Sequence, residues 1–129
     1  MILRKYLSLL GIGSAQIDLI LEKVTYMPGD SVQGYFLIKG GTIQQQIKQI
    51  DCQLVLIDKV KRIEEIIDTT TILLTTHIDP EESSKVEFTF QLPRSVPVSS
   101  EKISYRFKTK LTFTKGAESF DQDIIKIVV

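Results

Sequence analysis

The sequence of 129 residues contains a single cysteine and a single histidine. Because Cys52 has no second cysteine to pair with, an intramolecular disulfide is excluded, and a reducing compartment is the simpler expectation. Cys52 and His77 together are also too few to close a zinc site, which needs about four ligands. We therefore expect a cytoplasmic protein with no metal site and no cofactor.

The sequence has few residues that could act together as a catalytic nucleophile and a general base, which argues against an enzyme. Because His77 is the only histidine, a catalytic histidine base would have to be His77, and it would have to lie within hydrogen-bond reach of a serine or cysteine. His77 instead stands just before an Asp79-Pro80 turn. Cys52 falls on the apolar side of an alternating segment, where cysteine acts as a small hydrophobic residue. Pairs of carboxylates such as Glu64-Glu65 are adjacent, so on a strand they point in opposite directions. No catalytic residue is predicted.

Net charge and long hydrophobic runs are missing too. Lys plus Arg total 16 and Asp plus Glu total 16, so no overall field attracts nucleic acid or an anionic bilayer. The apolar run at residues 6–12 is interrupted by Ser8 and Gly11 and is too short to span a bilayer or to make a convincing secretory leader. Hydrophobic residues nevertheless make up 43% of the chain, which is typical of a folded domain.

Residues 1–13 have the periodicity of a short amphipathic helix that ends at Gly11 or Gly13. Its apolar side consists of Leu3, Tyr6, Leu7 and Leu10. This side is a candidate contact with a partner, and docking on a second copy would make a homo-oligomer. The same helix could instead lie in a membrane interface, but Arg4 and Lys5 alone supply charge, so membrane contact is not expected.

From Ala15 onward the period changes from helical to two, which predicts strands. Turn residues separate the alternating segments, above all Pro28-Gly29, which suits a type II turn, and Asp79-Pro80. An edge strand is expected between residues 63 and 78, where β-branched residues are frequent. About seven strands without a later helix predict one all-β domain over residues 1–129, an immunoglobulin-like sandwich of two antiparallel sheets.

One surface feature suggests a binding role. The outward side of the strand over residues 103–113 carries a basic ribbon, made of Lys102, Arg106, Lys108 and Lys110. The ribbon could grip an acidic or phosphorylated segment of a protein. It could equally be neutralised across the sheet, with Asp121 and Asp123 on the next strand as the expected partners. These two carboxylates share one side of their strand, but Ca²⁺ needs six or more oxygens, so no metal site is predicted.

Several motifs resemble the bacterial sporulation-control proteins of arrestin-like fold. They are Gly11-Ile12-Gly13, Tyr26-x-Pro28-Gly29-Asp30, Val32-Gln33-Gly34, Lys39-Gly40-Gly41, Ile50-Asp51-Cys52-Gln53-Leu54 and Phe88-x-Phe90-x-Leu92-Pro93, followed by Pro97 and Tyr105. The resemblance covers nearly the whole chain. Its residues form turns, close contacts and strand ends, so it implies an amino-terminal arrestin-like domain and carries over no active site.

The resemblance also implies a function. It points to a cytoplasmic, non-enzymatic adaptor or regulator that binds a protein partner and modulates a developmental signalling pathway. The alternative is a structural module that forms a homo-oligomer or lies on a membrane through residues 1–13. Family members of this kind have a second sandwich, so the chain is either part of a longer two-domain protein or a minimal relative.

Overall fold

The structure, a computed structural model, describes residues 13–116 and 118–129. The helix predicted at residues 1–13, with its candidate contact residues, lies almost wholly outside the described part. Nine strands are present in the described residues. They are β1 (Gln16–Leu21), β2 (Thr25–Tyr26), β3 (Ser31–Lys39), β4 (Gln45–Asp58), β5 (Ile63–Leu73), β6 (His77–Ile78), β7 (Ser83–Gln91), β8 (Ile103–Phe113) and β9 (Ser119–Ile127).

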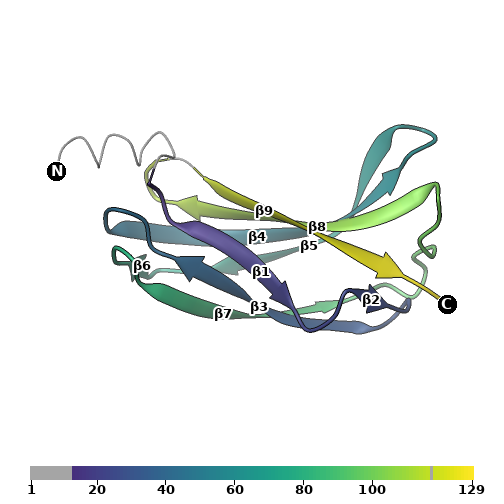
Figure 1. Cartoon of the computed structure of the whole chain (residues 1–129), viewed down its shortest axis with the longest axis horizontal. Coiled ribbons are helices and arrows are strands. Elements are labelled where there is room, and N and C mark those ends of the chain that lie inside the picture. The colour runs from purple at the N-terminus through teal and green to yellow at the C-terminus, as the bar shows by residue number, and fades with distance from the viewer. Residues whose placement is uncertain (1–12, 117) are drawn as a thin grey trace.

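The strands form two sheets that pack face to face (Figure 1). One has three strands in the order β1-β3-β7, and the other has the order β2-β9-β8-β4-β5, with β6 paired to β4. All pairings are antiparallel except that of β2 with β9. The predicted two-sheet sandwich is therefore confirmed. The two-residue strands β2 and β6 add to the seven long ones.

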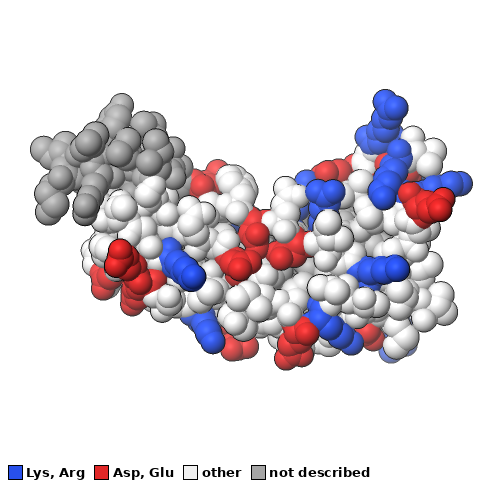
Figure 2. Space-filling model, in the orientation of Figure 1, with Lys and Arg blue, Asp and Glu red and all other residues white. Residues whose placement is uncertain are grey.

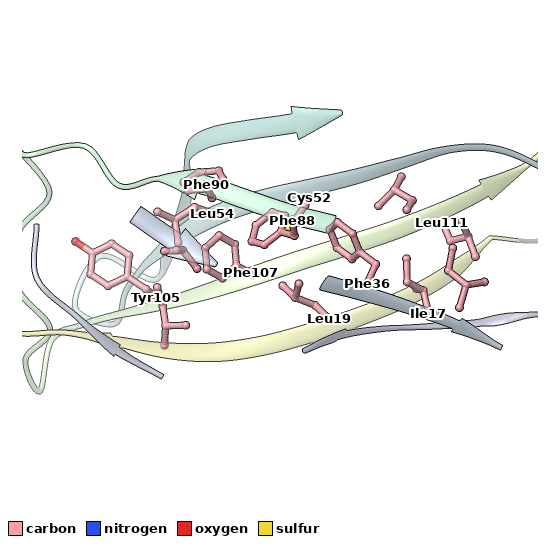
Figure 3. Close-up of a cluster of buried hydrophobic side chains, with 14 of the residues drawn as sticks. Ile17, Leu19, Phe36, Cys52, Leu54, Phe88, Phe90, Tyr105, Phe107 and Leu111 are labelled. Carbon is pink, nitrogen blue, oxygen red and sulfur yellow. The ribbon is translucent and has the colours of Figure 1, made fainter. Parts of the chain in front are cut away.

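Alternation along the strands decides which side chains enter the core. Phe36 and Ile38 of β3 are fully buried while Lys39 is exposed, and every odd residue of β8 from Tyr105 to Phe113 is buried. A buried aromatic group joins the sheets: the ring of Phe107 on β8 lies 5.5 Å from Phe88 and 5.2 Å from Phe90, both on β7 (Figure 3). These edge-to-face contacts add to the hydrophobic burial that holds the two layers together.

Two glycines confirm the structural roles that the sequence suggested. Gly29 has a φ of 86° in the turn before β3, where the Asp30 amide donates to the Met27 carbonyl at 3.1 Å. Gly34 lies opposite Leu21 in the β1–β3 pair, and a Cβ atom there would come 2.2 Å from the backbone oxygen of Ile20. Glycine suits position 29 because the turn there has a positive φ, and it suits position 34 because the close approach of β1 leaves no room for a side chain.

Candidate partner-binding surface

The basic ribbon lies on the outer face of the larger sheet, where register sets its neighbours. On the β9 side, Arg106 pairs with Ile124, Lys108 with Gln122 and Lys110 with Phe120. On the β4 side the same residues pair with Val55, Gln53 and Asp51. Lys102 stands before β8, beside the turn between β4 and β5, where its carbonyl accepts from the Lys59 amide at 2.9 Å. The ribbon on the sheet face therefore consists of Arg106, Lys108 and Lys110.

The side chains that contact the basic ribbon are not the ones predicted. The Lys108 Nζ lies 2.6 Å from Glu64 Oε2, the Lys110 Nζ lies 3.4 Å from Glu118 Oε2, and Arg106 Nη1 donates to Gln122 Oε1 at 3.1 Å. The predicted pairing with Asp121 and Asp123 is wrong. Outward residues of β8 are even-numbered and face even-numbered residues of β9, so the two aspartates point to the opposite face of their strand.

A shallow depression of ≈360 Å³ lies on this outer face. Its lining includes Lys108, Lys110, Asp51 and the ring of Phe120. Each lysine already has a carboxylate partner, so an incoming acidic group would have to displace Glu64 or Glu118. Such exchanges between exposed ion pairs gain little free energy.

Asp121 and Asp123 instead meet Asp18 of β1 where the two sheets come together, and carboxylate oxygens of the three lie within 4.8 Å of one another. Figure 2 shows acidic side chains gathered near the centre of the view, where β1 and β9 run side by side in Figure 1. Asp121 Oδ2 accepts from the Leu19 amide at 2.8 Å, and Ser119 Oγ accepts from the Ile17 amide at 3.3 Å. These bonds close the outer edge of β1.

The crowding of carboxylates changes their titration. Burial, followed by the hydrogen bond and charge of Asp121, raises the pKa of Asp123 to about 7. Partial burial and the neighbouring Asp121 also raise the pKa of Asp18. The three carboxylates lie close enough together to hold a cation, and Asp121 among them is the acceptor for the Leu19 amide at the β1 edge.

The two residues considered for catalysis are not brought together. Cys52 is fully buried, and burial raises the pKa of its thiol to about 12, although Thr109 Oγ1 donates to its sulfur at 3.5 Å. His77 is exposed on β6 with its Nε2 3.9 Å from Asp79 Oδ1. A thiolate nucleophile is disfavoured at neutral pH in such a site.

The edge strand predicted between residues 63 and 78 is present as β5, which pairs with β4 and with no other strand of the described chain. It exposes three large apolar side chains, Ile63, Ile66 and Leu73, at 51%, 56% and 75%. The other long free edge, β7, exposes none. A bulge between Leu54 and Val55 on β4 interrupts the pairing, and nearby Asp68 Oδ1 accepts from the Thr69 amide at 2.8 Å.

A groove of ≈390 Å³ borders the first half of β5. The strand contributes Glu65, Ile66 and Ile67, and Leu56 comes from β4. The opposite wall is the segment after β7, which contributes Pro93, Ser95, Val96 and Pro97. An exposed backbone edge and a groove with both apolar and polar lining groups therefore lie next to each other, an arrangement suited to an extended peptide.

Comparison with known proteins agrees with the motifs. A family model described as SpoOM protein matches residues 3–129. The chain belongs to this family. The sporulation-control protein spo0M of Bacillus subtilis (strain 168) is 37% identical over 121 residues, which are 89% of this chain and 47% of that protein.

The crystal structure of Spo0M from Bacillus subtilis superposes with a TM-score of 0.83 and 35% identity, over 92% of this chain and 51% of that one. The sandwich is thus the arrestin-like one that the motifs implied. This Spo0M-family chain spans about half the length of both relatives. A cycloisomaltooligosaccharide glucanotransferase of Paenibacillus, 16% identical with a TM-score of 0.57 over 88% of this chain and 14% of its own, shares the fold alone.

Sequence reasoning missed two features of the Spo0M-family chain, the joining of Asp18 to the Asp121–Asp123 pair and the groove beside β5. Both depend on which strands become neighbours across more than 25 residues of sequence. Asp18 gave no signal, because it takes an exposed place in the alternation of β1, between buried Ile17 and Leu19. The groove had none, since proline-rich connections follow many strands.

Proposed function

We propose that this chain is a regulatory module of sporulation control that acts by binding a protein partner, and that the partner adds a strand to the free edge of β5. The observation that carries the proposal is the exposed edge itself, with three exposed apolar side chains. The family relationship supports a role in sporulation control, because the relative is named a sporulation-control protein. A cytoplasmic location accords with a single buried thiol.

Strand addition suits β5 for a physical reason. A sheet edge presents unpaired backbone N–H and C=O groups, and natural proteins usually protect it with lysine, proline or a bulge. β5 has no lysine or proline, and its protection comes from the bulge and from the charges of Glu64, Glu65 and Asp68 in its first part. The residues from Thr69 to Leu73 pair regularly with Gln53 to Gln49 and carry no charge, so they offer a regular template.

The competing surface is the outer sheet face with its basic ribbon, and one experiment separates the two. The full chain serves as bait in lysate of its own organism, beside Ile66→Lys and Leu73→Lys on the β5 edge. Ile124→Lys is the matched control, because Ile124 is exposed to a similar extent, 67%, but lies on the sheet face. All three sites are exposed, so effects on stability should stay within about 0.5 kcal/mol.

We expect proteins that the parent and the Ile124→Lys bait recover equally and that both β5 variants lose. Recovery that is indifferent to the β5 variants, or lost with Ile124→Lys alone, contradicts strand addition at β5. Sedimentation of the purified chain identifies the special case in which the added strand comes from a second copy, because the β5 variants would then convert a dimer to a monomer.

A further inference from the structure

The groove beside β5 is preformed rather than a gap between mobile parts. Its floor is made by Leu56 and Val96, which are 8% and 7% exposed. The wall that faces β5 is tied to the body of the sandwich: the buried Tyr105 hydroxyl donates to the Pro97 carbonyl, and the Leu92 amide donates to the Asp30 carbonyl at 2.9 Å. A ligand would therefore meet a shaped surface without first having to order it.

Charge along β5 has one sign. Its charged residues are Glu64, Glu65 and Asp68. Glu64 is paired with Lys108, and Asp68 accepts a hydrogen bond from the adjacent Thr69 amide. Glu65 alone lines the groove, and it forms no ion pair or side-chain hydrogen bond within residues 13–116 and 118–129. Its carboxylate also helps burial to raise the pKa of the neighbouring Tyr105.

We infer that the groove accepts a lysine or arginine side chain from the strand that adds to β5, with the apolar stem along Ile66, Ile67 and Val96 and the cation on the Glu65 carboxylate. The inference rests on the proposed function. It goes beyond it by naming the residue class that the partner must supply.

Long cationic side chains match this groove better than purely apolar ones. Lysine and arginine lay their methylene stems along apolar surface while the charged end stays at the rim. A purely apolar occupant would leave the Glu65 carboxylate at the groove unpaired. On an added strand, a cation opposite Glu65 also forms the cross-strand pair of opposite charge that stabilises sheets.

The test uses the full chain and a nine-residue peptide that alternates threonine and valine, with lysine at the centre. The peptide is N-methylated along one edge so that it cannot pair with itself. Matched peptides carry norleucine or glutamate at the centre. Binding is followed by NMR through the δ-methyl groups of Ile66 and Ile67, with Ile124 as a remote reporter on the sheet face.

We expect the lysine peptide to shift the Ile66 and Ile67 signals with a Kd about fivefold below that of the norleucine peptide, the effect of one exposed ion pair. Glu65→Gln should equalise the two, and Glu65→Lys should reverse the preference toward glutamate. Glu65 is exposed, so both variants should keep the fold, which unchanged shifts at Ile124 verify.

Equal Kd values for the lysine and norleucine peptides, unaffected by Glu65→Gln, overturn this inference but leave strand addition standing, because both peptides would still bind at β5. No response at Ile66 or Ile67 to millimolar peptide also overturns it. Strand addition then stands or falls on the capture experiment with the Ile66→Lys and Leu73→Lys baits.

Discussion

Burial, followed by the hydrogen bond and charge of Asp121, raises the pKa of the Asp123 carboxyl far above its ordinary value, and its titration links stability to pH. The pKa is about 7 in the folded chain, against 3.8 for a solvent-exposed aspartate. The folded state therefore binds this proton more tightly than the unfolded state. This contribution to the free energy of unfolding is fully present below about pH 4, falls as the pH rises toward 7 and is lost above it.

The Asp123→Asn variant should remove that loss. We expect it to be more stable than the parent at pH 8 by about 1–2 kcal/mol, a figure reduced for the partial solvent exposure of the carboxyl, and to gain little at pH 4. Urea unfolding at both pH values measures this. Glu87→Gln, which removes one exposed negative charge on β7, is the control. An equal gain from Asp123→Asn at both pH values would contradict the assigned titration.

Gly34 is a position within the β1–β3 pair where a single added carbon should cost stability. The nearest atom to a Cβ there is a backbone oxygen, 2.2 Å away, so relief requires β1 and β3 to separate. We expect Gly34→Ala to lower the free energy of unfolding by about 1–3 kcal/mol. Ser31→Ala on the same strand, at an exposed site, should change it little in the same denaturation measurement, and equal effects of the two would refute the close contact.

At the level of elements, β1 shows how a sheet edge can be closed by side chains of the other sheet. Ser119 and Asp121 of β9 accept from the amides of Ile17 and Leu19 in turn. A buried amide that is left without an acceptor lowers the free energy of unfolding by about 1–3 kcal/mol. The unpaired edge of β5 thus contrasts with a satisfied edge at β1 in the same molecule.

This closure predicts a paired hydrogen-exchange result. Ser119→Ala should speed exchange of the Ile17 amide more than that of Leu19, and Asp121→Ala should do the reverse, because each variant removes one acceptor. Each variant is thus the control for the other. Exchange that rises equally at both amides in both variants would indicate general loosening of β1 and contradict the specific hydrogen bonds.

Strands and turns could be predicted because their signals are local. The alternation of Val86, Phe88 and Phe90, or the Pro28-Gly29 turn, needs no knowledge of distant residues, and each was confirmed. The pairing of the basic ribbon was predicted wrongly because adjacency in sequence order gave the correct neighbouring strand but not the register. Because successive residues of a strand point to opposite faces, the odd-numbered Asp121 lies on the opposite face from the even-numbered residues of the basic ribbon. The groove needed the tertiary fold.

The molecule as a whole depends on a core that both sheets share, and Cys52 lies in it. The thiol is fully buried, in the same cluster of core side chains as Phe88, Phe90 and Phe107 (Figure 3). No helix in residues 13–116 and 118–129 has the length and hydrophobicity to cross a membrane. The contact between the two sheets keeps solvent from the buried core, so solvent reaches Cys52 when the sheets separate.

Cys52 should consequently report global unfolding. We expect a disulfide reagent to label it at least about a thousandfold more slowly than an exposed thiol, because labelling requires opening against several kcal/mol. The control is Val129→Cys combined with Cys52→Ala, since Val129 is 98% exposed. The labelling rate should rise with urea along the unfolding curve. Fast labelling in the absence of denaturant would mean that the sheets open locally around Cys52, which would contradict a single cooperative core.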